Sequence, residues 1–424
     1  MQLPDLYDIY LQYPSVQTDT RKLKPGDIYF ALKGPSYNGN QFARQALDAG
    51  AAYAVVDEPV NFSDERLIAT EDVLQTLQQL AKYHREQFEI PFIAITGSNG
   101  KTTTKELVHE VLSSTFTTYT TKGNLNNHIG IPLTILSVGM DADMAVIEMG
   151  ANHQKEIESY CVYTNPTHGI ITNCGKAHLE GFGGIEGVRK GKGELYDHIR
   201  ANNGTLFLMK DYDYLVEMSK GISNIITYGT TGAMITGITD SSKEMLEVRM
   251  LSGTGIKKIQ TQLVGEYNLP NVLVAVAVGK YFNVPDEKIK AALENYSPSN
   301  SRSQLVEIDG NKIILDAYNA NPTSMKAAIE NIAKMNGDKV LMLGGMMEMG
   351  EESLKEHQAL VDLINMYDWK EVVLVGGDFI KVNNPFTTFA TSTEAGKWLK
   401  EKHFTNTTIL VKGSRSMQME KVLE

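Results

Sequence analysis

Cysteine is scarce in this chain of 424 residues: only Cys161 and Cys174 occur, both in largely apolar stretches. Two such residues offer neither the spacing of a metal site nor a disulfide framework, so a reducing compartment is expected. Apolar runs of membrane-spanning length are also missing, and the N-terminus lacks a basic segment followed by an apolar core. These absences predict a cytoplasmic protein without membrane insertion.

Positive charge is in deficit, with 40 Lys and Arg against 51 Asp and Glu, a net charge of −11. This balance argues against broad binding to nucleic acid or to an anionic membrane. Negatively charged ligands must therefore be held locally by loops, cationic side chains or metal. Low-complexity segments and fixed-period repeats are absent too. What remains has the length of two or three globular domains, with 42% hydrophobic and 21% charged residues.

A glycine-rich turn follows a short apolar, β-type run at residues 92–95. Residues 96–104 read Thr-Gly-Ser-Asn-Gly-Lys-Thr-Thr-Thr, and a helical pattern continues to Leu112. This is the context of a phosphate-binding loop, where backbone N–H groups converge on phosphate oxygens at a helix N-terminus. Lys101 would reach the β- and γ-phosphates, and the Thr102 hydroxyl would ligate Mg²⁺. The alternative is a plain turn between a buried strand and a surface helix.

This loop is shorter than the common form, which has a glycine where this chain has Ile95. Generic motor and switch NTPases are therefore a poorer match. The pattern still predicts that the chain binds a nucleoside triphosphate. The residues expected to do so are Gly97, Ser98, Asn99, Gly100, Lys101, Thr102 and Thr103.

Three units are predicted along the chain, and all belong to the α/β class. The first unit is residues 1–88, a small α/β domain. The central unit, residues 89–299, alternates strands and helices, which predicts a doubly wound, mostly parallel sheet with an antiparallel appendage at 243–264. The third unit, residues 300–424, predicts a smaller parallel sheet of Rossmann-like type. Strands are expected at 27–32, 52–57, 92–95, 144–149, 168–173, 204–209, 313–316, 340–343, 372–375 and 408–411, and helices at 73–88, 269–282, 324–335, 353–367 and 393–402.

Three polar side chains of the central unit are candidates for the chemistry. Glu148 lies near the end of a predicted buried strand, where a carboxylate can ligate Mg²⁺, although it can equally be a capping or surface residue. His178 follows the next strand in a glycine-rich loop and suits a cation or phosphate contact, or a solvated loop. Lys192 lies on the following helix, where a basic solvent-facing surface is the simpler interpretation.

Asparagines precede a predicted helix start in the central unit, at Asn124, Asn126 and Asn127. They are suited either to positioning a substrate or to forming turns. Sequence spacing does not choose between these roles.

Residues 316–322 of the third unit join an acidic strand end to an Asn-rich turn and a helix start. Asp316, Asn319 and Asn321 are the polar residues there, although Asn-Pro is also a routine way to begin a helix. Arg302, near the junction of the central and third units, can either close on phosphate or stay solvated.

Several segments together resemble the Mur ligase family: residues 96–104, 123–127, 148–150, 177–184, 192–194 and 316–322. Residues 316–322 and Lys412-Gly413-Ser414-Arg415 are the most discriminating. The resemblance runs nearly end to end and includes Asp19-Thr20-Arg21. Within the family, the chain is most similar to members that add D-alanyl-D-alanine. Other members, and folylpolyglutamate synthetase, usually carry a His where Ala320 stands.

The resemblance implies a uridine-substrate domain, a central ATPase domain and a mobile C-terminal domain. It implies one Mg²⁺ held by Thr102 and Glu148, and a second held by His178 and a carbamylated Lys192. Those groups and Lys101 are the implied catalytic residues. It further implies nucleotide contacts from Asn268, Asn271, Arg302 and Asp316, and substrate contacts from Thr20, Asn124, Asn126, Asn127, Asn319 and Asn321. Tyr267 departs from the family, because a His is frequent there.

The implied activity is ATP-dependent joining of D-alanyl-D-alanine to UDP-N-acetylmuramoyl-tripeptide (UDP-MurNAc-tripeptide) through an acyl phosphate. This reaction serves cytoplasmic peptidoglycan synthesis, and through it cell shape and division. A monomer that binds small molecules and no nucleic acid is expected. Two alternatives stay open: a sister ligase adding another amino acid or glutamate, and a switch ATPase that makes no bond. The third residue of the tripeptide, lysine or diaminopimelate, is not encoded in any motif.

Overall fold

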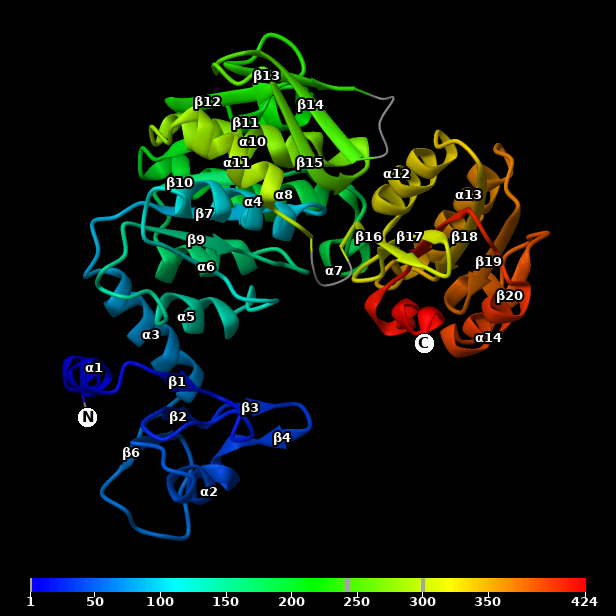
Figure 1. Ribbon diagram of the computed structural model, residues 1–424. Helices are drawn as coiled ribbons and strands as arrows, with labels where there is room; N and C mark the ends of the chain where they lie inside the picture. The colour runs from blue at the N-terminus through cyan, green and yellow to red at the C-terminus, as the bar shows by residue number, and fades with distance from the viewer. Residues whose placement is uncertain (1, 241–244, 299–301) are drawn as a thin grey trace.

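The computed structural model describes residues 2–240, 245–298 and 302–424. It forms three lobes, each built on its own sheet, with the C-terminus in the third (Figure 1). This confirms the predicted α/β fold class. The unit bounds 1–88, 89–299 and 300–424 stay predictions, and the names first, central and third unit are kept for them. No helix in the described ranges combines the length and apolar character of a membrane span.

The first unit contains a four-stranded parallel sheet of order β1-β2-β5-β6. Its helix α3 packs against α5 and α6 of the central unit and so ties the two together. A short hairpin, β3–β4, lies inside the predicted loop at 33–40. The elements are α1 (Leu3–Gln12), β1 (Val16–Gln17), β2 (Ile28–Phe30), β3 (Lys33–Gly34), β4 (Tyr37–Asn38), α2 (Ala43–Asp48), β5 (Tyr53–Val56), β6 (Leu67–Ala69) and α3 (Val73–Arg85).

The central unit contains a nine-stranded sheet of order β15-β14-β13-β12-β11-β10-β7-β9-β8. Strands β7 to β13 pair in parallel, and β14 and β15 add the antiparallel edge that the polar alternation predicts. Residues 243 and 244 of that predicted appendage lie outside the described residues. The strands are β7 (Phe92–Thr96), β8 (Thr118–Thr120), β9 (Met144–Glu148), β10 (His168–Ile171), β11 (Thr205–Met209), β12 (Asn224–Gly229), β13 (Ile235–Thr239), β14 (Met245–Ser252) and β15 (Lys258–Val264).

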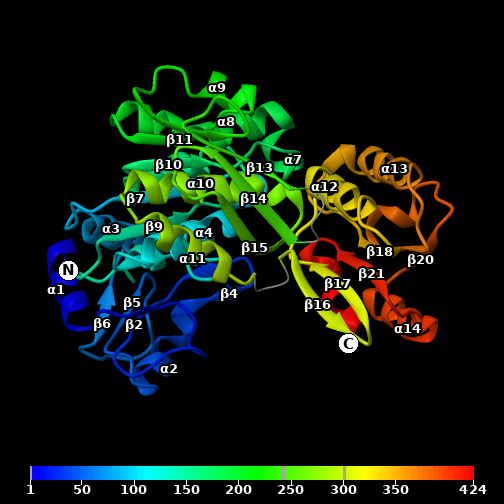
Figure 2. The same cartoon turned by 45° about the horizontal axis from the view of Figure 1, so that its top comes forward.

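Helices pack on both faces of this sheet, and the parallel strands β7, β9, β10 and β11 at its centre are buried along their whole length (Figure 2). Helix α10 is buried along most of its length because it packs on α4 and on β11, β12 and β13. The helices are α4 (Lys101–Ser113), α5 (Gly130–Ile135), α6 (Glu156–Thr164), α7 (Leu179–Phe182), α8 (Ile185–Ala201), α9 (Asp213–Met218), α10 (Leu269–Tyr281) and α11 (Asp286–Asn295).

The third unit contains a six-stranded sheet of order β16-β17-β21-β18-β19-β20. Its strands are parallel except β16, which pairs antiparallel with β17 and corrects the prediction of an all-parallel sheet. The cause is a two-residue hairpin turn at Asp309-Gly310, where both residues have positive φ. The elements are β16 (Gln304–Ile308), β17 (Asn311–Asp316), α12 (Pro322–Ala333), β18 (Asp338–Gly344), α13 (Ser353–Ile364), β19 (Glu371–Val375), β20 (Thr387–Phe389), α14 (Ser392–Lys402) and β21 (Thr407–Lys412).

Candidate active site

A cavity of about 890 Å³ lies where the central and third units meet. The carboxyl ends of β7, β9, β10 and β11 face it from the central unit, and the ends of β17 and β21 face it from the third. Ligands of open α/β sheets bind at such strand ends. The cavity therefore lies where a ligand of this fold class is expected to bind.

The phosphate-binding loop forms part of the cavity wall. Gly97 has φ +143° and Gly100 has φ +80°, in the region that favours glycine. A Cβ on Gly97 would lie 2.0 Å from the Thr172 hydroxyl oxygen, and one on Gly100 2.7 Å from Asn271 Oδ1. Both glycines are therefore required by close approach as well as by backbone conformation.

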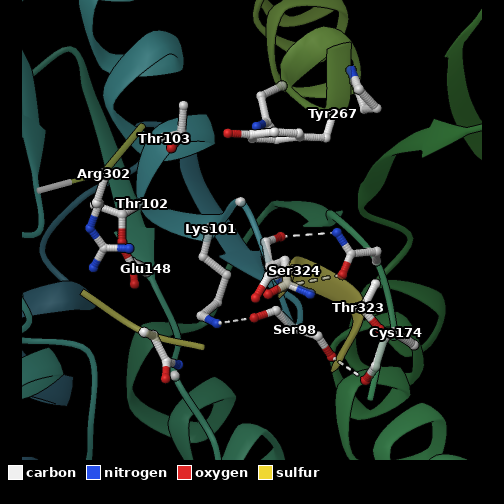
Figure 3. Close-up of a pocket in the computed structure, with 18 of the residues that line it drawn as sticks. Ser98, Lys101, Thr102, Thr103, Glu148, Cys174, Tyr267, Arg302, Thr323 and Ser324 are labelled. Atoms are coloured by element: carbon white, nitrogen blue, oxygen red, sulfur yellow. Dashed lines mark hydrogen bonds between the residues drawn. The ribbon is translucent and has the colours of Figure 1, made fainter. Parts of the chain in front are cut away.

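Lys101 begins helix α4, and its amine folds back onto the loop. Its Nζ donates to the carbonyl oxygens of Gly97 (2.7 Å) and Ser98 (3.2 Å). Burial lowers the pKa of Lys101, the charge of Glu148 opposes this effect, and the charge of Arg302 adds to it. Figure 3 shows the amine pointing toward Ser98 on the floor of the cavity.

Glu148 and Thr102 offer oxygen ligands at the same wall. Glu148 ends β9, is only 1% exposed, and accepts a hydrogen bond from Asn126 Nδ2 at 2.8 Å. Its other oxygen, Oε2, is buried and receives no hydrogen bond from any described residue. A buried, unpartnered carboxylate oxygen beside a threonine hydroxyl fits a hard divalent cation.

The protein ligands for a cation at this wall are few. Across the described ranges, no group of three or more His, Cys, Asp or Glu side chains is placed to hold a metal. Mg²⁺ commonly keeps waters and phosphate oxygens as ligands, so Thr102 and Glu148 would provide the protein share. These two groups therefore fit a metal ion that binds together with a nucleotide.

His178 and Lys192 have different surroundings from the pair that the resemblance implies. His178 lines the cavity, and its Nδ1 pairs with the Glu348 carboxylate of the third unit. Lys192 is 1% exposed, lies behind the cavity wall, and donates to the Ala151 carbonyl at 3.0 Å. Desolvation first, and the charge of Lys101 second, lower the pKa of Lys192 to about 7.

The asparagines near residue 126 divide into wall and turn residues. Asn126 and Asn127 line the cavity, while Asn124 is exposed and does not line it. The Asn127 side chain also accepts from the backbone N–H of Gly130 at 2.9 Å, a turn-forming contact. Thr20 lies in the first unit and is not part of this cavity.

The adenine-side residues implied by the resemblance meet at the start of α10. Asn268 and Asn271 line the cavity, and Asn271 Nδ2 donates to Asn268 Oδ1 at 2.9 Å. Next to them, the Tyr267 hydroxyl is 3.0 Å from Ser303 Oγ of the third unit. Tyr267 therefore joins the two units at the position where it departs from the family.

The third unit contributes Arg302, Asp316 and Asn319 to the cavity wall. Asp316 is paired with the buried Lys412 amine at 2.6 Å, so the end of β17 is tied to the end of β21. Asn321 does not line the cavity but caps α12. Its Nδ2 donates to Asn99 Oδ1 of the phosphate-binding loop at 2.7 Å.

Sequence reasoning missed the polar pairs that join the central and third units. The Lys176 amine pairs with Glu356, Lys334 pairs with Glu266 at 2.7 Å, and Glu348 pairs with His178. These partners are far apart along the chain and share no spacing pattern.

Three α/β units, with a cavity between the central and third units and a phosphate-binding loop in its wall, define a P-loop nucleotide-binding protein. Three family models cover most of the chain: "Mur ligase family, catalytic domain" matches residues 12–91, "Mur ligase middle domain" 95–279, and "Mur ligase, glutamate ligase domain" 301–415. The chain belongs to the Mur ligase family. The resemblance of the sequence motifs is confirmed by these matches.

Curated relatives match the chain over almost its whole length. The UDP-N-acetylmuramoyl-tripeptide--D-alanyl-D-alanine ligase of Escherichia coli (strain K12) is 34% identical over 100% of this chain and 96% of its own. The enzyme of the same name from Bacillus subtilis (strain 168) is 33% identical over 96% and 92%. Among solved structures, MurF from Acinetobacter baumannii has a TM-score of 0.87 at 31% identity, covering 96% of this chain and 92% of its own.

Proposed function

We propose that this chain is an ATP-dependent ligase that joins UDP-MurNAc-tripeptide to D-alanyl-D-alanine in peptidoglycan synthesis. The observation that carries the proposal is 34% identity over the full chain to a ligase of that name, together with the P-loop cavity between units. The two observations agree, because a P-loop can bind the ATP whose phosphoryl group activates the carboxylate in such a ligase.

The proposed reaction has two steps. The terminal carboxylate of the tripeptide attacks the γ-phosphorus of ATP, which gives an acyl phosphate and releases ADP. The amine of D-alanyl-D-alanine then attacks the acyl carbonyl, loses its proton, and inorganic phosphate leaves. Lys101 is placed to bind the β- and γ-phosphates, whose negative charge favours its protonated form. Arg302 and Asp316 hold the nucleotide from the third unit, and closure of that unit excludes water from the acyl phosphate.

The same proposal includes Mg²⁺, with Thr102 and Glu148 as its protein ligands. The unpartnered Glu148 Oε2 is the feature that supports this assignment. Bound Mg²⁺ would neutralise charge on the transferring phosphoryl group. A second ion beside His178 belongs to the proposal as well, since His178 lines the same cavity.

Carbamylation of Lys192 is the most specific part of the cofactor proposal. None of the comparisons supports it, and its case rests on the surroundings of Lys192 alone. A buried amine with pKa near 7 is substantially neutral at neutral pH and can add CO₂ to become a carboxylate. A carbamate carbon signal after loading with ¹³CO₂, lost in Lys192→Gln, would establish it, and an unmodified amine would remove it.

The remaining residue assignments are also proposals. Asn268 and Asn271 would lie near adenine, while Asn126, Asn127 and Asn319 would contact the peptide substrates. A cytoplasmic monomer without nucleic-acid partners is proposed from the acidic charge and from two buried cysteines that form no disulfide. Thr20 would act on the uridine side, in the first unit.

ATP-dependent phosphate release tests the function directly. It is measured with UDP-MurNAc-tripeptide, with and without D-alanyl-D-alanine, and the product is weighed by mass spectrometry. Release that requires both, with the mass of the condensed pair, is expected. Condensation with another amino acid or glutamate instead would make the chain a sister ligase. Release that needs neither acceptor would make it a switch ATPase.

A further inference from the structure

Arg302 has an unusual position among the cations of the cavity. It enters the wall at the start of the third unit, and its guanidinium carbon lies 3.6 Å from the centre of the Tyr318 ring. Within the described residues, the Arg302 guanidinium has no hydrogen bond and no ion pair with a carboxylate. The face of the Tyr318 ring is therefore the contact that orients it.

Tyr318 is itself well anchored. It stands two residues beyond the end of β17, whose last residue, Asp316, is fixed by the buried Lys412 amine at 2.6 Å. Lys412 Nζ also donates to the carbonyl of Asn319, at 3.1 Å, directly after the tyrosine. The turn that carries Tyr318 is thus held at both sides by one ammonium group.

The stacked guanidinium faces the catalytic groups. Arg302 lines the same cavity as Thr102 and Glu148, where a metal-bound triphosphate is proposed, and Figure 3 draws the three side chains in one region of the view. The pKa of Lys101 is lowered mainly by burial, is raised by Glu148, and is lowered further by Arg302, so the Arg302 charge acts across the site. A ring that covers one face of a guanidinium leaves its N–H edges free for bidentate contact with phosphate oxygens.

We propose that Tyr318 is a positioning residue, which holds the Arg302 guanidinium flat so that its N–H edge meets the phosphates of the nucleotide. This rests on the proposed nucleotide role of Arg302 and goes beyond it by naming what orients the arginine. Stacking restricts a long, otherwise mobile side chain before ATP binds. The ring face performs this function, and the Tyr318 hydroxyl does not.

Two substitutions at Tyr318 separate the ring from the hydroxyl. Tyr318→Phe keeps the ring and should leave kcat/KM for ATP within about 2-fold of the original. Tyr318→Leu removes the ring face and should lower kcat/KM for ATP by about 5- to 30-fold, mostly through KM. KM for D-alanyl-D-alanine should not change. An equal loss in Tyr318→Phe and Tyr318→Leu would overturn the proposal.

The decisive measurement repeats Tyr318→Leu in an Arg302→Ala background. If the ring acts through the arginine, Tyr318→Leu should add less than about 2-fold there. The same 5- to 30-fold loss in both backgrounds would instead show a structural role. Tyr318→Met serves as a second variant if Tyr318→Leu unfolds at lower temperature.

A failed ligase assignment remains distinguishable from a failed role for Tyr318. If the unmodified protein forms no condensed product, the proposed function fails before any variant is compared. The parent, Tyr318→Leu, Arg302→Ala and the variant with both changes are then compared by equilibrium binding of ATP. Weaker binding in Tyr318→Leu only when Arg302 is present supports the positioning role, and equal binding in all four overturns it.

Discussion

The two faces of the cavity are held in place by different kinds of contact. On the central face, Glu148 ends β9, and Lys101 begins α4 directly after the loop that follows β7; β7 and β9 pair within one sheet in the register Ile95 to Glu148. On the third-unit face, Asp316 ends β17 of a separate sheet, and Arg302 lies two residues before β16 of that sheet. The third unit contacts the central unit through side-chain ion pairs and a backbone hydrogen bond from Glu180 to Glu348. The phosphate site is therefore fixed by a core, whereas the opposite face is placed by polar contacts between units.

This difference suits a reaction with two steps and three substrates. Partly exposed ion pairs are weak, because water competes for both partners. A third unit held by such pairs can move away from the central unit and back at low cost in free energy. Such movement lets substrates enter and ADP and product depart. The phosphate-binding face has no such freedom, because its groups are buried with the strands that carry them.

The largest effect is expected from removing the amine of the central face. Lys101→Ala should lower ligation by at least about 10³-fold, since it deletes the cation proposed to bind the transferring phosphoryl group. Product formation is measured with all three substrates present. Lys122→Ala, at an exposed lysine of the same unit, is the matched control and should keep full activity. Ligation by Lys101→Ala within 10-fold of the control would remove the lysine from the chemistry.

Glu148→Gln should have the next largest effect, about 10²-fold on kcat. Glutamine can still accept the hydrogen bond from Asn126, which is 2.8 Å in the parent structure, so the change isolates the carboxylate charge. The Mg²⁺ concentration needed for half-maximal activity should rise in parallel. An unchanged Mg²⁺ requirement would contradict the assignment, and Glu110→Gln on the exposed face of α4 is the control.

The same division explains what the sequence could predict. Lys101, Thr102 and Glu148 are tied to strand ends, so a local pattern of a buried strand followed by glycines predicts their place. The buried runs at 144–149 and 168–173 likewise predict β9 and β10. The antiparallel pairing of β16 could also have been predicted, because Asp309-Gly310 is a typical sequence for a two-residue hairpin turn.

The contacts of the third-unit face had no local signal. Asn321 was expected to bind substrate, yet its side chain caps α12 and bonds to Asn99, 222 residues away in the chain. The pairing of Glu348 with His178 likewise depends on how two units meet. Such partners depend on tertiary placement, because spacing patterns describe one helix or strand at a time.

Breaking one ion pair between the units tests directly whether polar contacts place the third-unit face of the cavity. Lys176→Met should raise KM for ATP by about 3- to 10-fold and leave the melting temperature nearly unchanged. It removes the partner of Glu356, whose side chain is only 8% exposed, and so weakens docking of the third unit. Steady-state kinetics at several ATP concentrations would measure the change.

The chain offers a matched control for that variant. Lys355 pairs with Glu352 within the third unit, both largely exposed, at 2.9 Å. Lys355→Met breaks an ion pair without crossing between units and should leave KM for ATP unchanged. Equal effects of the two variants would mean that loss of charge, rather than loss of docking, weakens ATP binding.

His357 holds the segment of the third-unit face that carries Glu348. Its Nδ1 donates to the Ser353 carbonyl at 2.7 Å, and its Nε2 accepts from the Met346 N–H at 3.0 Å, so the ring must be neutral. Burial lowers the pKa of His357 below its ordinary value of 6.5, although the bond to Ser353 opposes this effect.

The smallest effect is therefore a pH dependence confined to the third unit. Between pH 6.5 and the lower pKa of the folded protein, the unfolded chain binds the proton that folded His357 does not, so stability falls as pH falls. His357→Gln does not titrate and should lose less stability between pH 7.5 and 5. Trp369 and Trp398, the two tryptophans, both lie in this unit, so their fluorescence follows its unfolding. Parallel pH profiles for the variant and the parent would show that His357 is not the group responsible, and His403→Gln, at an exposed histidine, should match the parent.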